Sequence, residues 1–390
     1  MVREWAISIY LVIFSVLFNI SKLFPLKRKV TFVVSFSENS KSIYKEMLRQ
    51  EFSCRTLFLT TEKMYPHFKK FENSTTLLFN IKKPIHFVLS IYHLATSKVI
   101  LVDNYYGFLA KSNFKPTVEC IQLWHANGAI KKFGLKDPST KSRKEKAIKR
   151  FKDVYRRFSK VVIGSEAMAY IYKQAFEVSD EKLVRTGIPR TDVFFDKAVQ
   201  HGIRRKLLNK HPIFKNKKVI LYAPTYRENG LQKSEVELEL NKLADHFNED
   251  YILLLKLHPA IDNHIVIPEH LSDFILDFSS YHSLNELLFI TDILVTDYSS
   301  IPFEFCLLNK PIIFYLYDLE EYKKERGIWQ DFIEFLPGPV ANTSEEVISF
   351  IKGGFFNYAD IQLFSNKWNE YSTGNSSANV LNLIKHSLDK

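Results

Sequence analysis

The sequence predicts an α/β protein of two doubly wound halves facing a central cleft, preceded by an apolar helix. The chain has 390 residues, more than a single core usually accommodates, so two domains are expected. Strand patterns alternate with helical patterns from residue 29 onward, which predicts largely parallel sheets covered on both faces. The alternation restarts beyond a polar, basic stretch at 197–218. We therefore expect a helix in 1–25 and domains in 26–200 and 201–390, and leave open whether the last helix packs back on the first domain.

The apolar stretch WAISIYLVIFSVLFNIS at 5–21 carries no charge and is followed by Lys22, Lys27, Arg28 and Lys29. Its length is at the short limit for a membrane span. No small-residue cleavage pattern follows it, so a removed signal peptide is not expected. We predict a helix that lies in one leaflet with its basic flank on anionic headgroups. A single span and a buried core helix are the alternatives.

The first domain is expected to contain six main strands that alternate with helices. The strand patterns are at 29–36, 56–61, 75–81, 98–104, 120–125 and 160–165. Helical patterns follow at 38–48, 84–95 and 166–176. Asp103, His125 and Ser165 stand at strand ends, where doubly wound sheets bind their ligands.

The second domain repeats this alternation. Its strand patterns are at 218–224, 251–259, 274–278, 293–296 and 311–317. A helix is expected at 234–247, and another opens on the capping box formed by Ser283 and Glu286.

The chain is basic, with 54 Lys and Arg against 43 Asp and Glu, a net charge of +11. This excess favours an anionic partner: nucleic acid, anionic lipid or a phosphorylated substrate. No nucleic-acid recognition motif is present, so nucleic acid is not expected. The three cysteines are far apart without a CxxC pair, which excludes a disulfide framework or zinc cluster and favours a reducing, cytosolic setting.

Most of the excess charge lies in the segment 141–160, which has ten Lys or Arg against two acidic residues. Its apolar residues recur at helical spacing, which predicts an amphipathic helix with one basic face. Such helices often bind membrane surfaces. A solvated, charged surface helix is the alternative.

Two histidines follow apolar strands, one in each predicted domain. His125 ends CIQLWH, and His258 ends YILLLKLH and is followed by Pro259. An imidazole there can take a proton from an attacking hydroxyl or, once protonated, stabilise a phosphate. We therefore expect the two histidines to share one catalytic site.

The stretch ILVTDYSSIPFEF at 293–305 predicts a buried strand, a polar turn and the start of a helix. Ser299 or Ser300 can cap this helix, Pro302 suits its first turn, and its N-terminus can bind a phosphate. Glu304 could accept from ribose hydroxyls. The alternative is an ordinary capped strand–helix unit without a ligand.

The segment YAPTYRENG at 222–230 places Thr225 and Arg227 at a strand end, where Arg can hold phosphate oxygens in a bidentate fork. Lys256, Lys131 and Lys132 could add positive charge. No P-loop, GxSxG, HExxH, GxGxxG or Asp-x-Asp motif is present. We therefore expect no metal site and no essential divalent metal.

Five ordered motifs resemble the CDP-glycerol glycerophosphotransferase family of wall teichoic acid synthesis: LWHANGAIKKFG, GIPRTDVF, YAPTYR, KLHPAI and TDYSSIPFEF. Together they cover roughly residues 98–317. The length resembles that of the priming members rather than the chain-extending polymerases. The resemblance implies two Rossmann-like domains of the glycosyltransferase-B type, bound peripherally to the cytoplasmic face of the bacterial membrane.

The resemblance also implies the reaction. Glycerol phosphate passes from CDP-glycerol to a ManNAc-GlcNAc disaccharide on undecaprenyl pyrophosphate, with release of CMP and no cofactor. His125 and His258 match the family's essential histidines. We expect CDP-glycerol to be bound by Thr225, Arg227, Lys256, Pro259, Asp297, Ser299, Ser300 and Glu304. We expect the acceptor and membrane to be contacted by Asn127, Gly128, Lys149, Arg150, Arg156 and Arg157.

Several readings stay open from sequence alone. A poly(glycerol or ribitol phosphate) polymerase, a nucleotide-sugar glycosyltransferase of the same fold and a non-enzymatic membrane scaffold are the alternatives. Which histidine is the base is not decided, and neither is a homo-oligomer or a complex with other teichoic acid enzymes.

Overall fold

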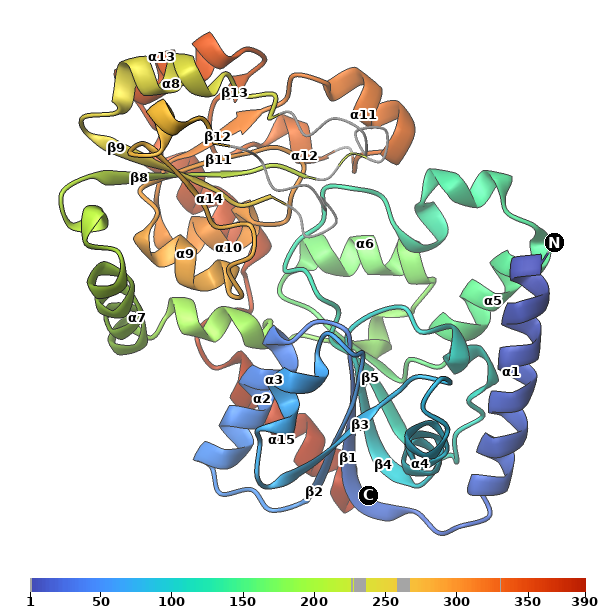
Figure 1. Cartoon of the computed structure of the whole chain (residues 1–390). Helices are drawn as coiled ribbons and strands as arrows, with labels where there is room; N and C mark the ends of the chain where they lie inside the picture. Colours follow the sequence, from blue (N-terminus) through green and yellow to red (C-terminus); the bar gives the residue numbers. More distant parts are fainter. Residues whose placement is uncertain (1, 226, 228–235, 258–266, 330) are drawn as a thin grey trace. The chain divides into compact units, whose positions relative to one another are not determined.

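The computed structural model describes residues 2–225, 227, 236–257, 267–329 and 331–390. It divides into two compact units (Figure 1). Unit 1 contains Met1–Asn127, Phe133–Asp192 and Glu370–Lys390, and unit 2 contains Gly128–Lys132 and Val193–Asn369. The basic stretch at 197–218 thus belongs wholly to unit 2.

Unit 1 is built on a seven-stranded sheet in which all neighbouring strands are parallel. Its strands are β1 (Lys27–Val34), β2 (Arg55–Thr60), β3 (Ser74–Leu78), β4 (Ser97–Val102), β5 (Glu119–Gln122), β6 (Lys160–Val162) and β7 (Leu183–Val184). They lie in the order β3-β2-β1-β4-β5-β6-β7. Continuous burial along β1 and β4 is what a sheet covered on both faces requires.

The main helices of unit 1 are α1 (Val2–Ser21), α2 (Glu38–Arg49), α3 (Tyr65–Lys69), α4 (Pro84–Ala95), α5 (Glu145–Tyr155), α6 (Glu166–Phe176) and α15 (Ser376–Asp389). The C-terminal α15 packs on α2, β4 and β1. Its buried face, Val380, Leu381, Ile384 and Leu388, belongs to the same core as Val30 and Phe32. The last helix therefore completes the core that the first strands begin.

Unit 2 is built on a six-stranded parallel sheet in the order β10-β9-β8-β11-β12-β13. Its strands are β8 (Lys218–Ala223), β9 (Tyr251–Leu255), β10 (Ile275–Asp277), β11 (Ile293–Thr296), β12 (Ile312–Tyr315) and β13 (Val340–Ala341). Its helices are α7 (Lys197–Lys210), α8 (Leu240–Phe247), α9 (Leu284–Ile290), α10 (Pro302–Phe305), α11 (Leu319–Arg326), α12 (Asp331–Glu334), α13 (Ser344–Gly353) and α14 (Tyr358–Trp368).

The two sheets have the same strand order. In each, the first strand lies between the second and the fourth, so the order reverses between β1 and β4 and again between β8 and β11. Ligands of doubly wound sheets bind outside the carboxyl ends of the strands at such a reversal. We therefore expect the ligand-binding residues to be those that follow β1, β4, β8 and β11.

Three local predictions need correction. The basic segment 141–160 forms a helix only over Glu145–Tyr155, because a 3-10 turn (Pro138–Ser142) precedes it. The capping box at α9 is half formed: Ser283 Oγ accepts from Glu286 N, while the Glu286 carboxylate accepts from Tyr281 Oη at 2.6 Å. The helix after β11 is N-capped by Ile301, without a side-chain cap from Ser299 or Ser300.

Candidate active site

Asp103 ties two strand ends of unit 1 together. It follows β4, and its carboxylate accepts hydrogen bonds from Ser35 N (3.0 Å), Phe36 N (2.8 Å) and Tyr106 Oη (2.6 Å). The partners at 35 and 36 follow β1, so the carboxylate lies at the reversal of strand order. Burial raises the Asp103 pKa to about 6, although these hydrogen bonds oppose the shift.

His125 lies in the turn after β5 and contacts the backbone of Asp103. Its Nδ1 is 3.0 Å from the backbone oxygen of Asp103. Because a carbonyl oxygen can only accept, Nδ1 carries the proton, and the lone pair of the neutral ring is on Nε2. The ring is stacked between Phe36, with centroids 4.2 Å apart, and Trp124, with centroids 4.4 Å apart. The hydrogen bond therefore fixes the tautomer of His125, and the two stacked rings fix the plane of its imidazole.

Burial lowers the His125 pKa to about 4; the hydrogen bond to Asp103 opposes this shift, and nearby Arg190 adds to it. The imidazole is consequently neutral at pH 7. A neutral ring with its lone pair on Nε2 can accept a proton, as a general base must.

Two residues outside the predicted site support the His125 turn. Asn39 Nδ2 donates to the Trp124 carbonyl at 2.9 Å, and Arg190 Nη1 donates to the His125 carbonyl at 2.9 Å. Asn39 Oδ1 also accepts from Arg190 N. These bonds hold Trp124 at φ 56°, a left-handed conformation that is unfavourable for a bulky residue. Arg190 lies in the motif GIPRTDVF, whereas no sequence signal marks Asn39.

Asn127 and Gly128, the two predicted acceptor contacts, are both buried. Asn127 is fully buried in unit 1, and Gly128 begins the short segment of the chain that belongs to unit 2. A Cβ on Gly128 would lie 2.3 Å from Cδ1 of the Phe303 ring in α10. The glycine is therefore needed for close packing of the backbone on that ring.

We predict that Gly128→Ala destabilises unit 2. The Phe303 ring cannot withdraw easily, because it packs on Phe364 (centroids 5.3 Å apart) and Trp368 (4.6 Å apart). Overpacking of this kind costs about 1–3 kcal/mol. Urea unfolding measures it, with Gly202→Ala in α7 as the control, since nothing lies within 4 Å of a Cβ there. Equal unfolding midpoints for the two variants would refute the packing role.

The segment Gly128–Lys132 pairs with residues 328–329 of unit 2. Lys131 forms an antiparallel bridge with Ile328, and Trp329 N donates to the Ile130 carbonyl at 2.9 Å. The Lys131 ammonium lies 5.8 Å from the centroid of the Tyr322 ring. Burial lowers its pKa to about 8, opposed by the nearby Asp297 carboxylate. Lys131 is thus a partly desolvated cation beside the end of β11.

Asp297 repeats in unit 2 what Asp103 does in unit 1. It follows β11, is buried, and accepts from Thr225 N, which follows β8, at 2.8 Å and 3.0 Å through its two oxygens. The same carboxylate pairs with Arg227 Nη2 at 2.9 Å. The Thr225 hydroxyl is buried without a hydrogen-bond partner among the described residues.

The expectation that Arg227 grips a phosphate with its guanidinium fork needs correction. Nε and Nη2 bind the two oxygens of Asp318 at 2.7 Å and 3.1 Å, and Nη1 donates to the Thr225 carbonyl at 2.7 Å. With Asp297 as a further partner, the donors of the fork are largely occupied by the protein. The guanidinium also lies over the ring of Tyr322, 4.7 Å from its centroid. These contacts make it a structural ion pair.

Lys256 is likewise held by the protein. Its ammonium donates to the carbonyls of Ser279 and Tyr281, both at 2.7 Å, so it fastens the turn after β10 rather than pointing to a phosphate.

The turn after β11 offers less to a phosphate than predicted. α10 has four residues, too few for a strong helix dipole. The Ser299 hydroxyl is within 2.8 Å of Thr296 Oγ1, and Ser300 is exposed. Glu304 is 3% exposed. His258 and Pro259 lie outside the described residues.

Two cations of α5 contact α1. Arg150 pairs with Glu4 at 3.5 Å, and the Lys146 ammonium donates to Ser8 Oγ at 3.2 Å. Lys149 and Arg156 are exposed. Arg157 differs from the prediction: its Nε is buried without a partner among the described residues, because the helix ends at Tyr155 and the chain turns toward β6.

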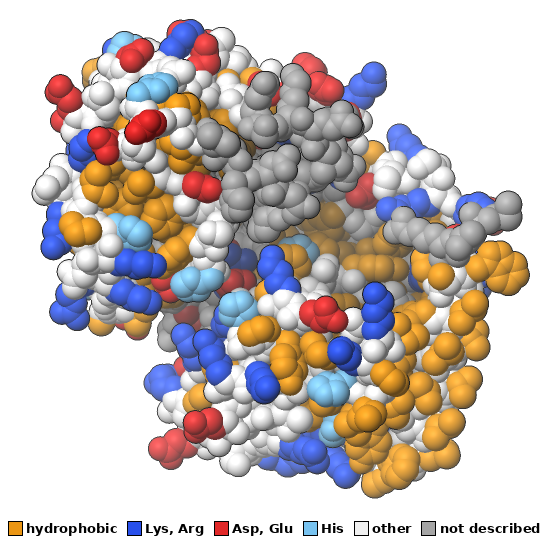
Figure 2. Space-filling view, viewed as in Figure 1, with side chains coloured by type: hydrophobic (Ala, Val, Ile, Leu, Met, Phe, Trp, Pro, Cys, Tyr) orange, Lys and Arg blue, Asp and Glu red, His pale blue; other side chains and the backbone are white. Residues whose placement is uncertain are grey.

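α1 is packed on one side and open on the other. Phe14 and Phe18 are fully buried, with their ring centroids 5.2 Å from Phe108 and 5.6 Å from Phe114. The opposite side exposes Trp5, Ile9, Val12, Val16 and Ile20. Figure 2 shows this band of hydrophobic side chains along α1. The window Glu4–Ser21 is long and apolar enough to cross a membrane, and only 22% of it is buried, so α1 is not an internal core helix.

Two parallel sheets, each with an aspartate across its reversal of strand order, define a two-unit, doubly wound α/β protein. Proteins of this class commonly bind their ligands at carboxyl strand ends. The chain belongs to the family described as CDP-Glycerol:Poly(glycerophosphate) glycerophosphotransferase, whose model matches residues 16–386. It is thus a transferase, and the resemblance inferred from the motifs is confirmed.

The chain is 40% identical over 358 residues to the teichoic acid glycerol-phosphate primase of Bacillus subtilis (strain 168), covering 92% of each chain. It is 35% identical over 387 residues to the teichoic acid poly(ribitol-phosphate) polymerase of Bacillus spizizenii, covering 95% of this chain and 58% of the polymerase. A solved structure of the wall teichoic acid polymerase TagF superposes with a TM-score of 0.82 at 21% identity, covering 100% of this chain and 98% of that one. The two-sheet α/β fold is therefore confirmed.

Proposed function

We propose that this protein primes wall teichoic acid. It transfers glycerol phosphate from CDP-glycerol to a ManNAc-GlcNAc disaccharide carried on undecaprenyl pyrophosphate. The observation that carries this proposal is the end-to-end match with a glycerol-phosphate primase: 92% of both chains is covered, against 58% of the polymerase. A structure of TagF soaked with CDPG supports CDP-glycerol as the donor.

In the proposed reaction an acceptor hydroxyl oxygen attacks the phosphorus of the glycerol phosphate group. The bond from that phosphorus to the CMP oxygen breaks, and CMP leaves with the electron pair. The proton of the hydroxyl passes to Nε2 of His125, whose Nδ1–H is held by the Asp103 carbonyl at 3.0 Å. Placement and preorganised charge supply the rest of the rate enhancement.

On unit 2 we propose that the donor is bound near the ends of β8 and β11. Lys131 is a partly buried cation there, and the Thr225 hydroxyl is a buried donor that lacks a partner among the described residues. Ser299, Ser300 and Glu304 remain proposed donor contacts, with His258 and Pro259 from the following motif. Asp297 and Arg227 hold this region in shape.

The product distinguishes this function from its rivals. Wild-type protein is incubated with CDP-glycerol and a lipid-linked disaccharide, and the product is examined by mass spectrometry. We expect an increase by one glycerol phosphate together with CMP release. A ladder of masses would identify a polymerase, and UDP release from a nucleotide sugar would identify a glycosyltransferase. Either outcome would refute priming.

We propose that no divalent metal is essential. Phosphate charge can be met by Lys131, and no group of three or more His, Cys, Asp or Glu is placed to hold a metal within the described ranges. Turnover is expected to persist in excess EDTA. Loss of turnover on chelation, restored by Mg²⁺, would show that a metal is required.

We further propose that α1 and α5 bind the cytoplasmic face of the membrane without crossing it. α1 exposes apolar side chains and α5 exposes the cations Lys149 and Arg156, the combination that binds anionic bilayers.

A charge reversal tests this surface. Lys149→Glu with Arg156→Glu should reduce sedimentation with phosphatidylglycerol vesicles while sparing turnover of a short-chain acceptor, because about 1 kcal/mol is lost per cation removed. Arg205→Glu with Lys206→Glu makes the same charge change on exposed α7 and serves as control. Equal vesicle binding of both double variants would contradict the proposed surface.

A further inference from the structure

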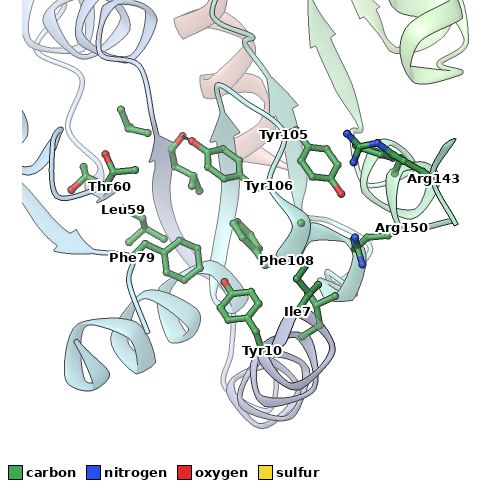
Figure 3. A pocket seen from close by; sticks show the side chains of 16 residues that line it. Ile7, Tyr10, Leu59, Thr60, Phe79, Tyr105, Tyr106, Phe108, Arg143 and Arg150 are labelled. Atoms are coloured by element: carbon green, nitrogen blue, oxygen red, sulfur yellow. Dashed lines mark hydrogen bonds between the residues drawn. The ribbon is translucent and has the colours of Figure 1, made fainter. Parts of the chain in front are cut away.

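Unit 1 contains a pocket of about 470 Å³ that the reaction described above does not use. One wall comes from the carboxyl ends of β1 and β2 and from the loop after β4, and the other from α1 and α5. Figure 3 shows α1 below it, with Tyr10 and Ile7, and Arg143 and Arg150 together at one side. A volume of this size holds a small ligand or the end of a larger one.

The lining is divided by chemistry. Most of it is apolar or aromatic, including Leu59, Phe79 and Phe108. Its cationic groups are the two guanidinium groups of Arg143 and Arg150. Arg143 lies over the Phe151 ring, 5.1 Å from its centroid, and donates to Ser139 Oγ at 3.2 Å. No described carboxylate forms an ion pair with it. An apolar pocket with cations at one end fits an amphiphile with an anionic head.

Arg150 is the more enclosed of the two, with 16% of its side chain exposed. Its one ion pair within the described part of the chain, to Glu4, is long at 3.5 Å. Arg143 is exposed and Arg150 is half-buried, so the two arginines retain a net positive charge, and guanidinium forks bind phosphate oxygens well. Burial raises the pKa of Tyr10 to about 12, so its phenol stays protonated and can also donate.

Two parts of the pocket wall indicate the chemical class of this amphiphile. α1, which forms one wall through Ile7 and Tyr10, exposes apolar side chains on its opposite face. At the other wall Tyr106 lines the pocket and also donates to Asp103, whose carbonyl holds His125. The pocket thus connects the membrane-facing helix with the proposed general base.

We propose that this pocket binds the pyrophosphate and the first isoprene units of the lipid-linked acceptor, with Arg143 and Arg150 on the pyrophosphate. This inference rests on the proposed priming function. The pocket is too small for a whole polyprenyl chain, so the remainder stays in the bilayer beside α1. The sugar attached to the pyrophosphate is then directed toward His125.

The first test is direct binding of farnesyl pyrophosphate to the full-length protein by calorimetry. Wild type is expected to bind, and Arg143→Ala to bind about 10–100-fold more weakly, as expected for loss of a charge-assisted contact. Arg143→Lys should recover part of the affinity, and Arg205→Ala, which removes an exposed arginine of unit 2, should match wild type. Equal binding by wild type and Arg143→Ala would overturn the proposal.

Competition identifies the ligand class. Farnesyl pyrophosphate should be displaced neither by CDP-glycerol nor by short-chain phosphatidylglycerol. Displacement by CDP-glycerol would make the pocket a donor site, and displacement by phosphatidylglycerol a phospholipid site. Either would overturn the inference.

Steady-state kinetics separate this inference from the priming function. Arg143→Ala should raise KM for the lipid-linked acceptor about 10–100-fold and leave the CDP-glycerol KM and the turnover of a disaccharide lacking pyrophosphate unchanged. If wild type turns over the lipid-linked acceptor but Arg143→Ala has the same KM for it, the pocket assignment is refuted and the priming function is not. If wild type does not turn it over, the priming function fails.

Discussion

Replacing His125 with alanine is expected to lower kcat by about 10²–10⁴, the usual contribution of a positioned general base. The loss should appear with both lipid-linked and soluble acceptors, because the proton is removed from the attacking hydroxyl in either case. The KM for CDP-glycerol should change little. His201→Ala, on the exposed surface of α7, controls for the loss of an imidazole. Unchanged kcat in His125→Ala would exclude it as the base.

The pH dependence gives a second readout of the same residue. Burial lowers the His125 pKa from its usual 6.5 to about 4, so its base form persists well below neutral pH. The acid limb of kcat/KM that reports this group should therefore lie near pH 4 rather than near 6.5. Because the folded protein binds this proton less readily than the unfolded chain, the associated stability is present above pH 6.5 and is lost as the pH falls toward 4. In His125→Asn both effects should disappear.

Arg227→Ala should destabilise unit 2 by about 3–5 kcal/mol, the usual cost of removing one partner from a buried charge network. Asp297 and Asp318, whose side chains are 3% and 14% exposed, would keep their charges without the guanidinium between them. Urea unfolding measures the loss. Arg227→Lys should recover only part of it, because an ammonium cannot reproduce the bidentate contact with Asp318.

The same experiment tests the original expectation for Arg227. If this residue bound the donor phosphate, Arg227→Ala would raise the KM for CDP-glycerol and leave the urea midpoint unchanged. That result would return Arg227 to the donor site and contradict the structural role. Arg205→Ala, which removes an exposed arginine, should alter neither quantity.

The parts of the fold that follow from local pattern were predictable. Alternating strands and helices indicate the two parallel sheets. Asp103, His125 and Asp297 follow strands as expected, because polar residues at carboxyl strand ends stand out against apolar strands. The two-residue strands β7 and β13 were missed, since so short a segment shows no periodicity.

What depends on distant partners was not predictable. Arg227 was assigned to phosphate because its principal partner, Asp318, is 91 residues away in sequence. Gly128 was assigned to the acceptor because nothing in its motif indicates the Phe303 ring. Arg150 was placed on the lipid face, whereas its partner Glu4 draws it toward α1. In each case a contact distant in sequence decides the role of the side chain.

The return of α15 to unit 1 has a consequence for biosynthesis. While the ribosome is still translating, the early strands have no partner for the surface that Val380, Leu381, Ile384 and Leu388 later cover. All of Val193–Asn369 emerges before that helix exists, so unit 2 has the opportunity to fold first. A premature stop codon that removes only the final helix should thus impair the half of the enzyme made earliest, and expose it to chaperones and proteases.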